Sequence, residues 1–289
     1  MKKIAVISGK GGTGKTVVTA SFAALASCGV LADCDVDAAD LHLLTKPRKR
    51  ERHEFRSGYT AKINPELCKR CGRCREVCRF EAVSRDFEID SIDCEGCGLC
   101  EKVCPCNAVV MEENFSGEWF ISDTEYGTLV HARLGIGEEN SGKLVSLVKQ
   151  VAFDTAEKEK AGYVIIDGPP GTGCPVIATL SDIDLAVVVT EPTLSGIHDM
   201  ERVIGVAGHF GISVAVVINK YDLNSENSRL IEENAGRNNV FICGHIPFSA
   251  SVNEAVVKGV CPVNFCEAEV VEKIKDSWKN ILRHLGDKI

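Results

Sequence analysis

The sequence predicts an α/β fold: a mostly parallel sheet covered by helices on both faces, with a small α+β domain inserted into it. Continuous runs of Val, Ile, Leu and Ala of strand length alternate with longer amphipathic segments, which is typical of a parallel sheet buried on both faces. Short spacers with repeated Cys and Gly interrupt this alternation, which later resumes. We therefore expect a large domain formed by residues 1–60 and 112–289, and a small inserted domain formed by residues 61–111.

The elements of the large domain follow from where the apolar runs begin and end. The expected strands are Lys3–Ser8, Val30–Asp33, Tyr163–Asp167, Leu185–Thr190, Ser213–Asn219 and Val240–Ile246. The expected helices are Thr16–Cys28, Leu144–Lys160, Ile197–Phe210 and Ser225–Asn234. We interpret the charged run 46–52 as a solvated connector.

A further helix is expected near the C-terminus. Its charges are mixed rather than basic, so we expect it to pack on the core rather than to bind a membrane surface. Its apolar positions recur at helical spacing and are Val271, Ile274, Trp278, Ile281 and Leu285.

Composition and charge narrow the class of protein. The net charge of −8 over 289 residues argues against a general nucleic-acid binder, which is normally basic. The first residues, MKKIAVISGKGG, have too short an apolar run for a signal peptide. No apolar stretch reaches the 18 or so residues that a membrane span needs. We expect a cytoplasmic protein that binds neither nucleic acid nor membrane.

A phosphate-binding loop is indicated directly after the first strand. Residues 9–16 read GKGGTGKT and fit G-x-x-x-x-G-K-[ST] between a strand and a helix. Backbone N–H groups and the helix N-terminus would hold phosphate, Lys15 would reach the terminal phosphates, and the Thr16 hydroxyl would bind Mg²⁺. A glycine-rich turn that matches by chance is the alternative. The candidate nucleotide-binding residues are Gly9, Lys10, Gly11, Gly12, Thr13, Gly14, Lys15, Thr16 and Val17.

Two later segments follow apolar strands and add polar groups. Asp167 ends the run YVIID, and we expect it to contact Mg²⁺ through water. Asn219 begins the sequence NKYD, which matches the N-K-x-D pattern that recognises guanine in many GTPases. An acid or amide at a strand end is weak evidence alone, but together with the loop it indicates a nucleotide site.

Eight of the 15 cysteines form two runs with the spacing C-x2-C-x2-C-x3-C. In a chain without an export signal, such cysteines are more often metal ligands than disulfides, and this spacing is typical of bacterial iron–sulfur proteins. A pair of structural zinc sites is the alternative. Pro105 follows the second run as expected, whereas Arg79 stands where a proline would follow the first. The runs are Cys68, Cys71, Cys74, Cys78 and Cys94, Cys97, Cys100, Cys104.

With these motifs the chain resembles, over nearly its whole length, P-loop ATPases of the MinD/Mrp superfamily that carry an inserted two-cluster ferredoxin domain. The extra Lys10 in KGGTGKT is similar to the deviant Walker A loop of that superfamily and of the nitrogenase iron protein. The resemblance implies a three-layer P-loop NTPase that is a slow, Mg-dependent ATP hydrolase, acting as a homodimer or as a heterodimer with a related ATPase. Lys10 would then reach the partner's phosphates as a finger residue; a solvated lysine is the alternative.

The resemblance also assigns roles around the nucleotide. Asp35 would lie in the first switch and orient the attacking water or hold a water on Mg²⁺, so that Lys10, Lys15 and Asp35 are catalytic. The Mg²⁺ ligand set would be Thr16, Asp35 and Asp167. In these relatives the asparagine at the position of Asn219 contacts adenine, and the segment around Pro247 is similar to theirs, which favours ATP over GTP.

Similarity to bacterial two-cluster ferredoxins implies crossed ligation, in which the fourth cysteine of each run binds the other cluster. Basic residues surround the first run and acidic residues the second, which is either ordinary surface charge or a difference in potential or docking partner. One [4Fe–4S] cluster would take Cys68, Cys71, Cys74 and Cys104, and the other Cys94, Cys97, Cys100 and Cys78.

Three functions stay open at the level of sequence. The first is ATP-gated electron transfer to an unknown redox partner, the second is delivery of clusters to client proteins, and the third is a positioning or regulatory ATPase that senses redox state. Two complete ligand sets favour stable clusters and hence electron transfer.

Three further cysteines lie outside these two runs. Cys174 has the spacing from Asp167 at which the nitrogenase iron protein places a cluster-bridging cysteine, but the stretch Leu134–Glu138 offers an acid in place of the second cysteine. We therefore favour a plain buried cysteine at 174. Cys261 and Cys266 are spaced unlike a C-x-x-C cluster scaffold, and a bridging site there is the minor alternative.

Overall fold

The structure is a computed structural model that describes residues 1–26, 29–135 and 141–286, and it divides into two compact units. The first comprises Met1–His53, Trp119–Arg133 and Ser141–Ile289, and the second comprises Glu54–Glu118 and a short segment that begins at Leu134. The expected insert, 61–111, lies within the second unit. The end of the helix expected at Cys28 lies outside the described residues.

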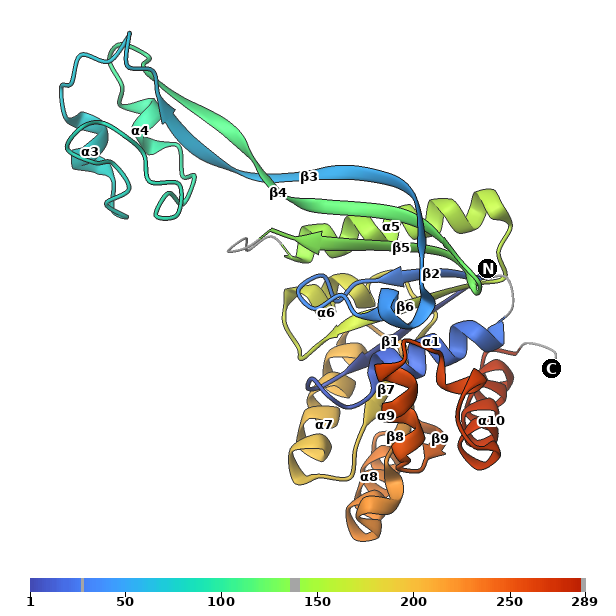
Figure 1. Ribbon diagram of the computed structural model, residues 1–289. Coiled ribbons are helices and arrows are strands. Elements are labelled where there is room, and N and C mark those ends of the chain that lie inside the picture. Colours follow the sequence, from blue (N-terminus) through green and yellow to red (C-terminus); the bar gives the residue numbers. More distant parts are fainter. Residues whose placement is uncertain (27–28, 136–140, 287–289) are drawn as a thin grey trace. The chain divides into compact units, whose positions relative to one another are not determined.

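One sheet of nine strands has the order β3-β4-β5-β2-β6-β1-β7-β8-β9 (Figure 1). Its described pairings β1–β6, β1–β7, β2–β5, β2–β6, β7–β8 and β8–β9 are all parallel, so the expected α/β class is confirmed. In the register, Asp33 lies beside Asp167. The strands are β1 Lys2–Ser8, β2 Gly29–Asp33, β3 Arg48–Ile63, β4 Val109–Thr124, β5 Gly127–Leu134, β6 Tyr163–Pro170, β7 Leu185–Thr190, β8 Ser213–Asn219 and β9 Phe241–Ile246.

Helices cover both faces of this sheet. Ile4 and Val6 of β1 share one core cluster with Phe22 and Trp278, whose rings lie 5.3 Å apart. This face is covered by α1 and α10. The alternate strand residues are buried on the opposite face, where α5, α6 and α7 contact the strands. The described α-helices of the first unit are α1 Lys15–Ala26, α2 Leu41–Thr45, α5 Ser141–Glu159, α6 Cys174–Leu180, α7 Leu194–His209, α8 Ser225–Arg237, α9 Ala250–Val257 and α10 Ala268–His284.

The expected C-terminal helix is α10, and it packs on the core as expected. Ile274, Trp278 and Ile281 are buried, whereas Val271 is half-buried. In the described part of the chain, no helix is both long and apolar enough to cross a membrane.

The charged run 46–52 is not only a connector, because β3 begins at Arg48. Residues 48–52 are all exposed and all charged, so the apolar alternation that marks a half-buried strand is missing. β3 lies at one end of the sheet order, and charged side chains on an edge strand discourage pairing with other chains. The sequence reasoning also missed β4, β5 and α9.

The same backbone conformation occurs twice in the second unit, once before each of its short helices. The short helices α3, Arg73–Val77, and α4, Leu99–Lys102, each begin after a glycine with positive φ: 83° at Gly72 and 72° at Gly98. Two residues earlier, Arg70 and Gly96 also have positive φ. The two cysteine runs therefore share a backbone conformation as well as a spacing.

The second unit has a small apolar core. Its buried members are Ala61, Cys74, Val83 and Val109, and cysteines make up much of the partly buried layer around them. Domains with so small a core normally need disulfides or bound metal to fold. The fold of this unit thus itself favours a bound group between its cysteines.

Candidate functional site

A pocket lies at the carboxyl ends of the central parallel strands, where ligands bind in open α/β sheets. The loop from Gly11 to Val17 forms its floor, and Asp35, Asn219 and Lys220 contribute to its walls. Three residues of α9 also line it and were missed from sequence, because nothing marked that helix: Val252, Asn253 and Val256. Of the expected nucleotide-binding residues, Gly9, Lys10 and Pro247 are not among those that line it.

Lys15 is buried between two carboxylates. Its Nζ lies 3.1 Å from Asp167 Oδ1 and 3.3 Å from Asp35 Oδ2. Burial lowers the pKa of Lys15, but the charges of Asp167 and Asp35 outweigh burial and raise it above its ordinary value. The ammonium group therefore stays charged and joins the end of β6 to the segment after β2.

Asp33 fixes the backbone that carries Asp35. Its carboxylate accepts hydrogen bonds from the N–H groups of Asp35, at 3.2 Å, and of Leu41, at 3.1 Å. Burial raises the pKa of Asp33 well above its usual range, and the charge of Asp167 adds to this. Burial also raises the pKa of Asp35. The site thus concentrates carboxylates that a divalent cation would stabilise in their charged form.

Asp167 presents one unpaired oxygen. Its side chain is fully buried, and Oδ1 accepts from Lys15 Nζ and from Thr19 Oγ1, the latter at 3.0 Å. Oδ2 and the Thr13 hydroxyl are buried side-chain atoms for which the described residues offer no hydrogen-bond partner. A buried unpaired oxygen is costly unless water, an ion or a ligand satisfies it. Thr16 and Asp35 line the pocket, whereas Asp167 is not among its lining residues and is joined to Asp35 through Lys15. These oxygen donors fit hydrated Mg²⁺, which prefers oxygen ligands.

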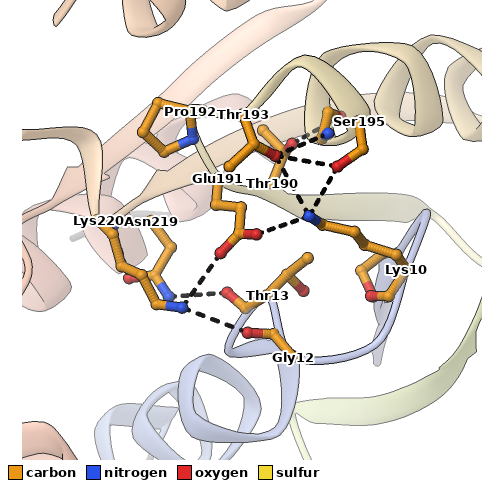
Figure 2. A network of polar contacts seen from close by, with 12 residues as sticks. Lys10, Gly12, Thr13, Thr190, Glu191, Pro192, Thr193, Ser195, Asn219 and Lys220 are labelled. Atoms are coloured by element: carbon orange, nitrogen blue, oxygen red, sulfur yellow. Dashed lines mark hydrogen bonds and ion pairs between the residues drawn. The ribbon is translucent and has the colours of Figure 1, made fainter. Parts of the chain in front are cut away.

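Lys10 is held on its own chain, by the loop that follows β7 (Figure 2). Its Nζ lies 2.7 Å from Glu191 Oε1 and donates to Thr193 Oγ1 at 3.2 Å and to Ser195 Oγ at 3.0 Å. Burial raises the pKa of Glu191, but hydrogen bonds from Lys10 and Lys220 outweigh it and lower the pKa below its ordinary value. Sequence reasoning missed Glu191.

The end of β8 holds the phosphate-binding loop from the other side. Asn219 Nδ2 donates to the carbonyl of Thr13 at 2.8 Å, and Lys220 Nζ lies 3.4 Å from the carbonyl of Gly12. A Cβ atom at Gly14, where φ is 92°, would lie 2.3 Å from Asn219 Nδ2. Only glycine fits at this position.

The second unit contains two small cavities, each lined by four of the eight cysteines. The grouping is crossed: Cys104 lies with the first three cysteines of the first run, and Cys78 lies with the first three of the second. In the described chain, no three His, Cys, Asp or Glu side chains are close enough to hold a single metal ion. Four more widely spaced thiols suit a multi-iron cluster, in which each thiolate binds a different iron.

Polar contacts to sulfur gather around the first cavity. The N–H of Arg70 donates to Cys68 Sγ at 3.4 Å, and the N–H of Ala108 donates to Cys104 Sγ at 3.2 Å. Cys106, a ninth cysteine that sequence reasoning passed over, lines the same cavity, with its Sγ 3.8 Å from that of Cys104. Burial raises the pKa of Cys104, but backbone N–H groups outweigh it and lower the pKa.

Comparison with known proteins identifies the larger unit. Residues 4–263 match the family described as the CobQ/CobB/MinD/ParA nucleotide binding domain, CbiA. The chain belongs to this family. The family is described by its nucleotide binding, so the pocket around Lys15 is a nucleotide-binding pocket.

Relatives and solved structures match over most of this chain. It is 41% identical over 287 residues to the uncharacterized protein MJ0578 of Methanocaldococcus jannaschii, covering 96% of each chain. The septum site-determining protein MinD of Pyrococcus horikoshii, solved with Mg-ADP, has a TM-score of 0.61 at 18% identity, covering 100% of this chain and 99% of that one. The cell division ATPase MinD of Pyrococcus furiosus has a TM-score of 0.59 at 18% identity, covering 98% and 99%. At these identities the structural matches show the fold alone.

Cys174 is exposed at the start of α6, which corrects the expectation of a buried cysteine. The helix begins on a surface turn, so its first residue faces solvent rather than the core. The acid at 138 and most of the stretch compared with it lie outside the described residues. Cys261 is fully buried with its thiol 3.5 Å from the carbonyl of Ala20, and Cys266 is half-buried. A buried thiol is poorly placed to bridge two chains.

Proposed function

We propose that this MinD/ParA-type ATPase binds and hydrolyses ATP with Mg²⁺ as a dimer and couples turnover to electron transfer through two [4Fe–4S] clusters in its second unit. One observation carries the proposal: each of two cavities is lined by a complete set of four cysteines in the crossed grouping of two-cluster ferredoxins. The preference for ATP rests on Asn219, which lies at the phosphate-binding loop.

The nucleotide half of the mechanism begins with Lys15. Its ammonium must leave Asp35 and Asp167 to reach the terminal phosphates, and this frees both carboxylates for a metal ion. Mg²⁺ bound by Thr16, Asp35 and Asp167 would neutralise charge on the phosphates. Asp35, held on the backbone that Asp33 fixes, is then placed to orient the attacking water.

Lys10 is the group that makes the reaction depend on a second chain. In the structure it pairs with Glu191 rather than with its own pocket. We propose that it exchanges this carboxylate for the phosphates bound to a partner ATPase, which is the same chain or a related one. There it adds positive charge where the transition state is most negative.

The two cysteine sets are the proposed cluster ligands. Cys68, Cys71, Cys74 and Cys104 would hold one [4Fe–4S] cluster, and Cys94, Cys97, Cys100 and Cys78 would hold the other. Bound clusters would supply one-electron chemistry. The protein contributes backbone N–H donors to sulfur and an apolar lining, both of which tune the potential.

Two other functions use the same residues. Delivery of clusters to client proteins would favour an incomplete ligand set, whereas each cavity here has four cysteines. A regulatory ATPase that senses redox state keeps both clusters, and it differs from electron transfer only in what the oxidation state controls.

The first experiment measures iron, sulfide and zinc in anaerobically purified protein. We expect about eight irons per chain, as two [4Fe–4S] clusters require. Cys78→Ser should damage the cluster otherwise held by the second run, while Cys174→Ser, outside both cavities, should leave the iron content unchanged. Stoichiometric zinc with little iron would refute the cluster assignment.

A further inference from the structure

Thr19 lies on the first turn-and-a-half of α1, below the phosphate-binding loop, and its side chain is fully buried. Its hydroxyl oxygen is 2.9 Å from the carbonyl oxygen of Lys15 and 3.0 Å from Asp167 Oδ1. A threonine hydroxyl has one proton to donate. Thr19 can therefore bond within its helix or to the carboxylate, but it cannot fully satisfy both acceptors at once.

The carboxylate of Asp167 has two unequal oxygens. Oδ1 receives Lys15 and Thr19, whereas Oδ2 is buried with no hydrogen-bond partner among the described residues. Holding one oxygen fixes the direction of the other. The rotation of the carboxylate about its Cβ–Cγ bond, and hence where Oδ2 points, depends on the two donors to Oδ1.

Nucleotide binding changes this balance, because Lys15 is the residue that reaches the phosphates in loops of this type. Once the ammonium group of Lys15 contacts the phosphates instead, Asp167 Oδ1 loses its charged donor. Among the described residues, Thr19 is then the remaining side chain that donates to Asp167. Its single proton has a stronger acceptor in a carboxylate than in the helix carbonyl.

We propose that Thr19 is a positioning residue for the metal ion: its hydroxyl holds Asp167 Oδ1, so that Oδ2 stays aimed at the site where hydrated Mg²⁺ binds with the nucleotide. This proposal rests on the proposed nucleotide function and deepens it. It adds to the metal site a residue three positions beyond the Thr16 hydroxyl, outside the motif that marks the loop. Outer groups of this kind typically change metal affinity 10- to 100-fold.

The test measures metal binding rather than turnover. Mn²⁺, which replaces Mg²⁺ and is visible by EPR, is titrated into the purified full chain saturated with ADP. Nucleotide affinity is measured separately with EDTA present. We expect Thr19→Val to weaken Mn²⁺ binding by about tenfold or more while the metal-free ADP affinity stays within about twofold. Thr19→Ser, which keeps the hydroxyl, should stay close to wild type.

Thr155→Val is the matched control. Thr155 is a buried threonine on α5 whose hydroxyl, among the described residues, bonds to its own helix at the Val151 carbonyl, 2.7 Å away. It should leave Mn²⁺ affinity unchanged. Thr19→Ala removes the hydroxyl without placing a methyl group against Asp167, and it replaces Thr19→Val if that variant does not fold by circular dichroism.

Several results would overturn the proposal. Unchanged Mn²⁺ affinity in both Thr19→Val and Thr19→Ala would do so. An equal loss in Thr19→Ser, or a matching loss of metal-free ADP affinity, would reduce Thr19 to a packing residue. If the wild-type chain bound no nucleotide at all, the proposed function itself would fail, which is distinguishable from a failure of Thr19 alone.

Discussion

At the scale of single residues, two lysines of one loop have opposite surroundings. Lys15 is buried between Asp35 and Asp167, whereas Lys10 is on the outside of the loop, where Glu191 holds it. The motif predicts that both lysines contact nucleotide phosphates. It cannot predict what they contact without nucleotide, because those partners lie on loops far away in the chain. Thr19 and Glu191 escaped prediction because the residues that they contact, Asp167 and Lys10, are far from them in the sequence.

This difference predicts separate effects for the two lysines. Lys10→Ala should leave ATP affinity nearly unchanged but slow turnover about 10³-fold, as expected for a finger residue. Lys15→Ala should weaken nucleotide binding itself, because it removes the charge inside the pocket. Steady-state ATPase rates and equilibrium binding of a fluorescent ATP analogue would separate them. Wild-type turnover in Lys10→Ala would rule out the dimer mechanism.

At the scale of elements, the sequence predicts the strands from β2 to β9 in the sheet order well and misses the three at the other end, β3, β4 and β5. β1, β6, β7 and β8 are continuous apolar runs because both of their faces are buried. β3 is charged because it is an edge strand, so no period in its sequence marks it. The crossed grouping of the cysteines was predictable, because their spacing is that of two-cluster ferredoxins. The residues of α9 that line the pocket carry no chemical signature.

An outer strand also carries a buried histidine, which makes stability depend on pH. His131 of β5 accepts or donates a hydrogen bond with Ser122 at 3.1 Å and stacks on Phe120. Burial, and then the charges of His42 and Lys49, lowers its pKa to about 4. Below pH about 6.5 His131 binds a proton in the unfolded chain, whereas in the folded chain it stays neutral until about pH 4. The contribution of neutral His131 to the free energy of unfolding is therefore fully present above about pH 6.5 and is lost as the pH falls toward 4.

His131→Gln should remove this dependence. Relative to the variant, the wild type should lose roughly 3 kcal/mol of unfolding free energy between pH 6.5 and 4. Urea unfolding followed by tryptophan fluorescence reports on the correct unit, because the two tryptophans, Trp119 and Trp278, both belong to the first unit. Parallel curves for wild type and variant would show that His131 titrates normally.

At the scale of the whole molecule, the chain's connectivity suggests how the two units communicate. The chain passes from the segment around Asp35 through α2 into β3, and it returns through β4 and β5 before reaching Asp167. In the proposed mechanism both acids lie in switch segments, and segments of this kind change when the terminal phosphate is lost. A ligand that favours one switch state must shift the other site by the same free energy, because linkage is reciprocal.

The central claim is that ATP and the clusters are coupled, and an anaerobic redox titration tests it most directly. Midpoint potentials of both clusters are measured with a non-hydrolysable ATP analogue, with ADP and without nucleotide. We expect the ATP analogue, and ADP less, to shift at least one cluster by tens of millivolts, where about 59 mV is tenfold for one electron. The cluster of Cys68, Cys71, Cys74 and Cys104, in its basic surroundings, should have the higher potential. Identical potentials in all three states, with ATPase rates that ignore cluster oxidation, would contradict the coupling.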